Sequence, residues 1–153
     1  MTGTTKIKAK PTKRQLPRQL EDFVGYHLRR ASALNMQDVT NALATVGQRP
    51  SGFSVACIIN EQPGITSADI CRTLGLQRAN IVPLLDELSG AGYIGRVDDE
   101  RDKRVQRLYL TDAGYDALET WHELVLSHEE RVLAKLSPSE RETLRELLVK
   151  IWN

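Results

Sequence analysis

The stretch from Gly75 to Thr111, GLQRANIVPLLDELSGAGYIGRVDDERDKRVQRLYLT, decides the fold. Within it, apolar residues recur at positions i, i+3, i+4 and i+7, which predicts a helix that buries one face. These residues are Ile81, Leu84, Leu85 and Leu88. The other face carries small, polar and basic residues: Arg78, Ala79, Asn80, Val82 and Pro83. A helix with one side in a core and this other side free can lie in a DNA major groove.

Two antiparallel strands are expected after this helix, at 93–97 and 105–110. Apolar and polar residues alternate from Arg107 to Leu110, as they do in a half-exposed strand. The tip between the strands, residues 98–104, reads DDERDKR. Its basic residues are placed to reach a phosphate backbone or a minor groove.

A second, shorter helix is expected just before this unit, at 67–74. Thr66 and Asp69 form a T-x-x-D pattern, which is typical of a capped helix start. Gly75 can adopt the left-handed conformation of a sharp turn into the next helix. Helix, glycine turn and helix indicate a helix-turn-helix, a corner that occurs in many helical bundles. The hairpin that follows makes the winged version, which is a far more specific combination.

Helical patterns flank the winged unit, at 17–46 and 51–61 before it and at 112–136 and from Pro138 onward after it. The fold class expected is mainly α with a small β-hairpin wing. The outer helices carry apolar stripes wider than one small core needs, so a second copy of the chain is expected to cover them in a two-fold dimer. The alternative is that they pack only within one chain.

Composition places the chain among ordinary globular proteins, with 41% hydrophobic and 27% charged residues. It holds no apolar run of about 20 residues and no apolar signal segment, so a cytoplasmic protein is expected. The net charge of +1 hides a segregation of charge, because 6–18 holds six basic and no acidic residues, while acidic residues outnumber basic ones after Thr111. We interpret residues 1–16 as a disordered basic arm, either a solubilising tail or a contact to phosphates.

Enzyme activity is not expected from this sequence. It holds no nucleophile–base pairing, no glycine-rich phosphate loop and no dinucleotide-binding motif, and therefore no cofactor is expected. Cys57 and Cys71 lie on apolar helix faces and should be buried and inert. The histidines lack metal-ligand spacing, so we expect structural roles for them and no metal site. They are His27, His122 and His128. The acidic run at 98–100 is interpreted as a solvated loop.

The order of elements and several local motifs resemble the MarR family of bacterial transcription regulators over residues 18–153. The motifs are Leu74-Gly75-Leu76, Leu84-Leu85-Asp86-Glu87-Leu88, Gly92-Tyr93-Ile94, Asp102-Lys103-Arg104, and Leu110-Thr111 followed by Gly114. The resemblance implies one domain at 17–153, with a winged helix-turn-helix at about 51–111 and dimerisation helices at about 17–46 and 112–153. It also implies that Arg104 enters the minor groove, that Asp102 orients it, and that Arg101 and Lys103 meet phosphates. A carboxylate two residues away can pre-order a guanidinium that would otherwise lose rotamer entropy on binding.

The expected DNA-binding residues lie at the start of the helix at 67–74, at the start and on the free face of the next helix, and in the wing. It consists of Thr66, Ser67, Gln77, Arg78, Asn80, Val82, Pro83, Arg101, Asp102, Lys103 and Arg104. Two positions depart from the family pattern: Gln77 stands where a capping Ser or Asp is usual, and Pro83 stands where a polar or basic residue is common. A proline there either bends the helix or, if the regular helix starts near Asn80, falls in its first turn.

The resemblance further implies a homodimeric, ligand-responsive repressor that binds a pseudo-palindromic operator and is released by a small effector. Aromatic acids and their acyl-CoA thioesters are the effectors favoured. The candidate effector residues are His27, Arg29, Arg30 and Trp121, which could equally be ordinary helix-face residues. The alternative function is a winged-helix module for protein–protein contact without a DNA function.

Overall fold

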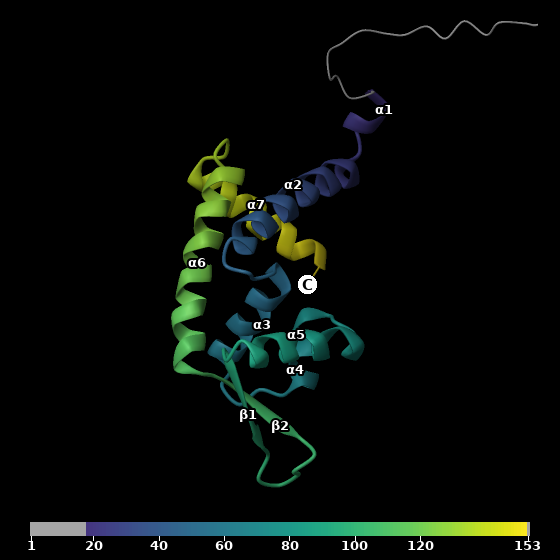
Figure 1. Cartoon of the computed structure of the whole chain (residues 1–153). Coiled ribbons are helices and arrows are strands. Elements are labelled where there is room, and N and C mark those ends of the chain that lie inside the picture. The colour runs from purple at the N-terminus through teal and green to yellow at the C-terminus, as the bar shows by residue number, and fades with distance from the viewer. Residues whose placement is uncertain (1–17, 153) are drawn as a thin grey trace, which may run out of the picture. The chain divides into compact units, whose positions relative to one another are not determined.

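The computed structural model describes residues 18–152. The described residues fall into two units, 18–33 and 34–152, of the Met1–Ala33 and Leu34–Asn153 division of the chain. The expected basic arm at 1–16 lies outside the described residues. The elements in chain order (Figure 1) are α1 Arg18–Glu21, α2 Val24–Ala44, α3 Pro50–Glu61, α4 Ser67–Leu74, α5 Arg78–Gly90, β1 Ile94–Asp98, β2 Gln106–Leu110, α6 Asp112–Val132 and α7 Pro138–Trp152. The predicted fold class, mainly helical with one hairpin, is confirmed.

The helix predicted at 17–46 is interrupted, and this part of the prediction is wrong. Asp22 and Phe23 separate α1 from α2. The break leaves carbonyls at the end of α1 without helical partners, and the ring Nε2 of His27 lies 2.9 Å from the carbonyl oxygen of Glu21. Asp is a weak helix former because its side chain competes for nearby backbone groups. The hydrophobic periodicity, which was the basis of the prediction, carries no information about such a short break.

The core of the 34–153 unit gathers apolar residues from the end of α2, from α3 to α5, from the hairpin and from α6. Leu43, Val55, Ile59 and Ile70 are fully buried in it. α3 packs against α5, β2 and α6, so it is the centre of this core. Each predicted core residue of the recognition-like helix is also buried there: Ile81, Leu84, Leu85 and Leu88.

The hairpin is tied back to the turn between α3 and α4. β1 and β2 pair antiparallel, with Ile94 opposite Leu110 and Asp98 opposite Gln106. On its other edge β2 bonds to that turn, since the Gly64 amide donates to the Leu108 carbonyl at 2.8 Å and the Leu108 amide donates to Ile65 at 3.1 Å. β2 is therefore paired on both sides, and β1 is an edge strand.

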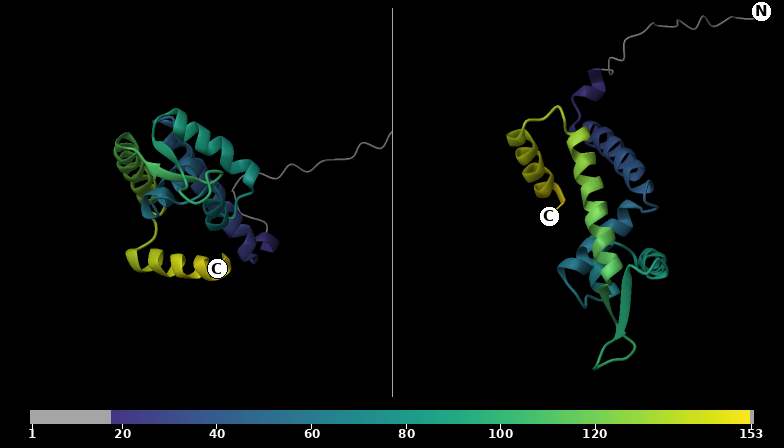
Figure 2. Two further views of the ribbon diagram at one scale, coloured as in Figure 1. Left: turned by 90° about the horizontal axis from the view of Figure 1, so that it is seen from below. Right: turned by 60° about the vertical axis from the view of Figure 1, so that its left-hand side comes forward.

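α6 begins where the hairpin ends, and its first turn touches the backbone before β1. Thr111 caps the helix by accepting from the Gly114 amide at 3.0 Å, as predicted. The Thr111 amide and hydroxyl donate to the carbonyls of Tyr93 and Gly92. A Cβ on Gly114 would lie 2.0 Å from the Tyr93 carbonyl oxygen, so only glycine fits this approach. Figure 2 shows α6 running from the hairpin base toward the turn before α7; it ends at Val132 rather than at the predicted Leu136.

α7 is amphipathic, and the described residues of the chain leave most of its apolar side chains exposed. Its start is a capping box in which the Ser137 amide donates to Glu140 and the Glu140 amide donates back to the Ser137 hydroxyl. Every residue of α7 is exposed or half-buried, including large apolar side chains. The exposed ones are Leu144, Leu147, Val149, Ile151 and Trp152. Within residues 18–152, no helix combines the length and apolar character that crossing a bilayer demands.

Candidate nucleic-acid interface

The predicted DNA face of α5 is exposed along its whole length. Ile81, Leu84, Leu85 and Leu88 point into the core from the opposite side of the helix. The exposed residues are Gln77, Arg78, Ala79, Asn80, Val82 and Pro83. Gln77 is the N-cap residue by backbone geometry, and its side chain makes no capping bond to any described residue. The Asn80 amide donates to the Gln77 carbonyl at 2.9 Å, so it is the amides before it, those of Arg78 and Ala79, that are placed to donate to an outside acceptor such as a phosphate.

Pro83 lies inside α5, five residues after its first residue Arg78. The alternative in which the helix starts near Asn80 is therefore wrong. Pro83 lacks the amide that would bond to the Ala79 carbonyl, so the helix passes through this position without that bond. Its ring is exposed and can offer only apolar contact, for example to a thymine methyl group.

The start of α4 forms the second part of the predicted face. Thr66 caps the helix, accepting from the Asp69 amide at 3.2 Å and donating to the Asp69 carboxylate at 2.6 Å. The hydroxyl of Thr66 lowers the pKa of the Asp69 carboxyl, with a smaller contribution from Arg72. Thr66 is thus committed to the fold, whereas Ser67 is exposed.

The wing tip presents the pair predicted from the resemblance. The Nε of Arg104 donates to the Asp102 carboxylate at 3.1 Å, and its Nη2 lies 3.4 Å from the second oxygen. The backbone amide of Arg104 donates to the same carboxylate at 3.1 Å. The Arg104 side chain is 91% exposed, so its guanidinium is oriented yet accessible. Arg101 and Lys103 are exposed beside it.

Asp99 has a structural role that the sequence interpretation missed. The run 98–100 was expected to be a solvated loop, and for Asp99 this is wrong, since its side chain is only 14% exposed. Its carboxylate accepts from the amides of Arg101 and Asp102 and from the guanidinium of Arg107. The amide of Arg101, followed by Arg107, holds the pKa of this carboxyl below its ordinary range. Asp99 is therefore ionised and organises the tip.

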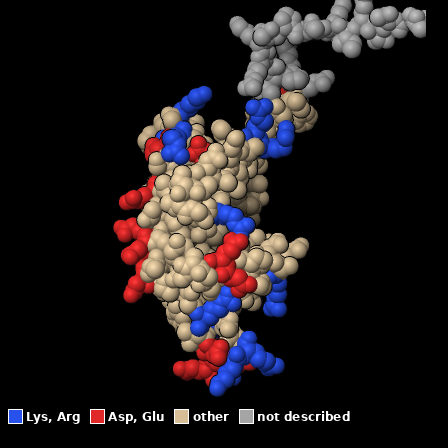
Figure 3. Space-filling view, viewed as in Figure 1, with Lys and Arg blue, Asp and Glu red and all other residues tan. Residues whose placement is uncertain are grey.

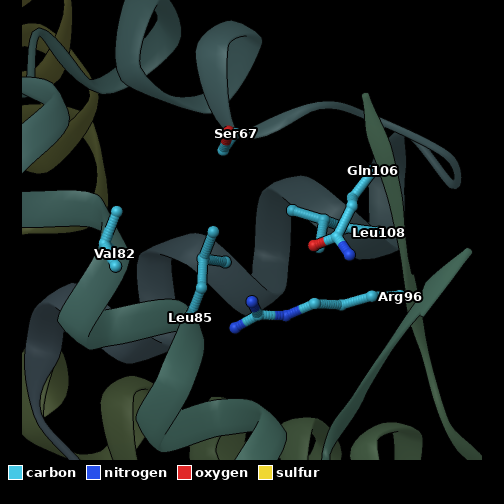
Figure 4. A pocket seen from close by; sticks show the side chains of 6 residues that line it. All are labelled: Ser67, Val82, Leu85, Arg96, Gln106 and Leu108. Carbon is cyan, nitrogen blue, oxygen red and sulfur yellow. The ribbon is translucent and has the colours of Figure 1, made fainter. Parts of the chain in front are cut away.

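Arg96 fixes the hairpin to the recognition-like helix and was also missed. From β1 its Nη2 donates to the Asp86 carboxylate at 2.6 Å, and its Nε lies 3.2 Å from the Ser89 hydroxyl. A hollow of about 180 Å³ lies between α4, α5 and the hairpin (Figure 4). It is lined by Ser67, Val82, Leu85, Arg96, Gln106 and Leu108. α4, α5 and the wing thus border one shared surface.

Charge is distributed along the 34–153 unit as the sequence suggested. Acidic side chains line the exposed side of α6, while acidic and basic groups mix at the wing tip (Figure 3). The exposed acidic residues of α6 are Asp112, Asp116, Glu119, Glu123, Glu129 and Glu130. On α5 the exposed basic residue Arg78 lies in the first turn, whereas the exposed acidic residues Asp86 and Glu87 lie in the second half of the helix and pair with Arg96 and Arg49.

Three of the four candidate effector residues gather around Tyr26 on α2. The guanidinium carbons of Arg29 and Arg30 lie 5.4 and 5.9 Å from the Tyr26 ring centre, and Arg30 donates to the Tyr26 hydroxyl at 3.1 Å. His27 packs edge-on against the same ring. The fourth candidate, Trp121, belongs to the other unit, is 2% exposed and packs edge-on against Tyr93. Tyr26 itself was not singled out in the sequence.

His128 joins α6 to the end of α2. It is 2% exposed, its Nδ1 lies 2.9 Å from the Asp38 carboxylate and its Nε2 lies 3.1 Å from the Asn35 side-chain oxygen. Arg131 also donates to Asp38, at 2.8 Å. Hydrogen bonds from His128 and then Arg131 lower the pKa of the Asp38 carboxyl. The structural role expected for His128 is confirmed.

Both cysteines were expected to be buried, and this is confirmed for Cys71 but not fully for Cys57. Cys71 is buried and Cys57 is half-buried. Burial raises the pKa of the Cys57 thiol, which disfavours the reactive thiolate. Among residues 18–152 there is no group of three His, Cys, Asp or Glu side chains arranged to hold a metal ion.

Comparison with known proteins gives one consistent result. Residues 50–105 match the sequence model of the MarR family. A transcriptional repressor, CouR, solved bound to a 23-mer DNA duplex, is 33% identical, with 91% of this chain and 99% of that chain covered and a TM-score of 0.85. CouR bound to p-coumaroyl-CoA is 31% identical, with 91% and 97% covered and a TM-score of 0.78. An HTH-type transcriptional repressor of Mycobacterium tuberculosis is 25% identical over 128 residues, 84% of this chain and 92% of its own length. The chain belongs to the MarR family of winged helix-turn-helix transcription regulators.

Proposed function

We propose that the protein is a homodimeric, ligand-responsive transcriptional repressor acting on a pseudo-palindromic operator in the cytoplasm. The observation that carries this proposal is the free face of α5, which lies beside a wing whose Arg104 is held outward by Asp102. The role is regulatory, not catalytic. In this reading Gln77, Arg78 and Asn80 contact base edges, and Arg101 and Lys103 contact phosphates.

The dimer supplies the second half of the interface. The uncovered apolar side chains of α7, such as Leu147, Ile151 and Trp152, give a second copy a surface to cover. A two-fold dimer places two α5 helices in successive major grooves, so half-sites about 10–10.5 bp apart are expected.

An acyl-CoA thioester of an aromatic acid is the effector that we propose. CouR, the relative described above, binds p-coumaroyl-CoA. In this protein Arg29 and Arg30 stand side by side over Tyr26 and could pair with the phosphates of such a ligand. Trp121 is 2% exposed, so contact with it requires a pocket that opens on binding. The bound ligand favours a dimer geometry with the wrong half-site spacing, and DNA is released by population shift.

The DNA part of the proposal is tested by Arg104→Ala, using a 25-bp duplex that the wild-type protein selects from a random-sequence pool. Loss of this minor-groove cation should weaken binding and reduce the slope of log K against log salt concentration by about one unit. Lys135→Ala is the matched control: Lys135 is exposed and lies past the far end of α6, roughly 30 Å from the wing by helix length. If Arg104→Ala and wild type bind the duplex with equal affinity, the wing arginine does not contribute to DNA binding. Failure to bind any duplex would favour the protein–protein alternative.

The effector part is tested by comparing p-coumarate with p-coumaroyl-CoA, which share the aromatic acyl group. Only the thioester carries phosphates. Thermal stabilisation and operator release should be stronger with the thioester. The double variant Arg29→Ala/Arg30→Ala should bind the thioester about tenfold more weakly than wild type, while its affinity for the free acid should stay unchanged. An equal loss for both ligands would exclude the phosphate contact.

A further inference from the structure

The tip of the wing is organised around one carboxylate, that of Asp99. Asp99 sits at the start of the tip with its side chain 14% exposed. One carboxylate oxygen accepts from the amides of Arg101 and Asp102, at 2.9 and 3.1 Å. The other accepts from the Nε of Arg107 at 2.7 Å. The Asp99 amide itself donates to the Val105 carbonyl at 2.8 Å, which closes the loop.

Arg107 connects Asp99 to the helix-turn-helix. Its Nη1 donates to the carbonyl of Gly64 at 3.1 Å, in the turn between α3 and α4. A guanidinium can make both contacts because its donors form a planar fork. The tip is therefore linked through Asp99 and Arg107 to the segment that precedes α4.

The second face of the hairpin is held separately. Arg107 pairs with Val97 across the sheet and Arg96 pairs with Leu108, so the two arginines are one register step apart and point to opposite faces. Arg96 binds Asp86 of α5, and Arg107 binds Asp99 and Gly64. The hairpin is thus braced on both faces, and Asp99 is the group that connects this brace to the residues of the tip.

We propose that Asp99 is a positioning residue for DNA reading, whose carboxylate strengthens DNA binding although its charge repels phosphate. It fixes the amides of Arg101 and Asp102, and Asp102 in turn orients Arg104. Without Asp99, the tip must be ordered when DNA binds, and that ordering reduces the affinity. This inference rests on the proposed DNA-binding function.

Simple electrostatics predicts the opposite sign. Removing a carboxylate near a DNA backbone removes repulsion and should tighten binding. The chain provides matched controls on either side of Asp99, because Asp98, the last residue of β1, and Glu100, in the tip, are both acidic and exposed. Asp98→Asn and Glu100→Gln remove the same charge as Asp99→Ala, without removing the acceptor of the two tip amides. Alanine is used at position 99 because asparagine would keep a carbonyl oxygen that can accept from those amides.

The experiment measures the affinity of full-length wild type and the three variants for the selected 25-bp duplex, from 50 to 300 mM salt. Asp98→Asn and Glu100→Gln should bind as tightly as wild type or more tightly. Asp99→Ala should bind at least about tenfold more weakly, with a salt slope lower by one to two units because tip contacts are lost. Partial unfolding lowers the active fraction without changing the slope, so the slope separates positioning from a loss of folded protein.

A second measurement does not use DNA. Amide hydrogen exchange by NMR should show the Arg101 and Asp102 amides exchanging at least about tenfold faster in Asp99→Ala than in Asp98→Asn, while the amides of α5 stay protected. Unchanged protection would overturn the inference. So would equal DNA affinities of Asp99→Ala and Asp98→Asn, and in that case the proposed function would survive because wild type still binds. Absence of DNA binding by the wild type itself would overturn both.

Discussion

Replacing Gly114 by alanine is a stringent test of the joint between the wing and α6. The added Cβ would lie 2.0 Å from the Tyr93 carbonyl oxygen and 3.0 Å from its carbon, and both atoms are backbone atoms that no rotamer change can move. Restoring an ordinary contact requires the two segments to separate until that 2.0 Å reaches about 3.4 Å. This shift would break the bond from the Thr111 amide to Tyr93 and strain the bond from the Thr111 hydroxyl to Gly92, at 3.0 and 2.6 Å.

The cost of this substitution follows from its parts. Two hydrogen bonds contribute about 1 kcal/mol each and overpacking costs about 1–3 kcal/mol, against which alanine returns up to about 1 kcal/mol of helix propensity. The free energy of unfolding should fall by roughly 2–4 kcal/mol, a large share of a typical domain's 5–15 kcal/mol.

Urea unfolding followed by circular dichroism measures this change, at one fixed protein concentration because a dimer's stability depends on it. Gly90→Ala is the matched control. It makes the same chemical change at the end of α5, where a Cβ meets open space among the described residues, so its unfolding free energy should stay within about 1 kcal/mol of wild type. A Gly114→Ala variant as stable as Gly90→Ala would refute the close approach of α6 to Tyr93.

Two further predictions concern the helices. Pro83→Ala restores an amide that can bond to the Ala79 carbonyl, so urea unfolding should show a gain of about 1–3 kcal/mol; a loss of stability would mean that the proline ring packs favourably. Folding lowers the pKa of Asp38 through His128 and Arg131. The stability from this carboxylate is therefore present above its unfolded pKa of about 4 and is lost as the pH falls through the lower folded value. Between pH 6 and 2.5, Asp38→Asn should lose less stability on acidification than wild type, and parallel curves would contradict the assignment.

Much of the fold follows from local patterns. The spacing of Ile81, Leu84, Leu85 and Leu88 identified the buried side of α5. It also identified the free side, because the residues between them in a helix of 3.6 residues per turn must point away from the core. The start of α4 at Thr66 was also read correctly from two residues three positions apart.

The parts that were missed depend on contacts between distant segments. Asp98, Asp99 and Glu100 are chemically alike in sequence, and only Asp99 is covered, because Arg107 reaches it from the returning strand and continues to Gly64. No short motif encodes that contact, which spans 43 positions between Arg107 and Gly64. Alternation along a strand shows which residues face the core, but it does not show which polar residue an exposed arginine will bind.

The separation of roles on α5 has a consequence for how this protein can change its target. Its four core residues hold the helix in place, while the outward residues Gln77, Arg78, Asn80 and Val82 make no contribution to that core. Exposed substitutions of this kind usually alter stability by less than about 0.5 kcal/mol. New operator preferences can therefore arise one residue at a time on an unchanged scaffold, and a library restricted to these outward positions is a direct route to variants with altered sequence specificity.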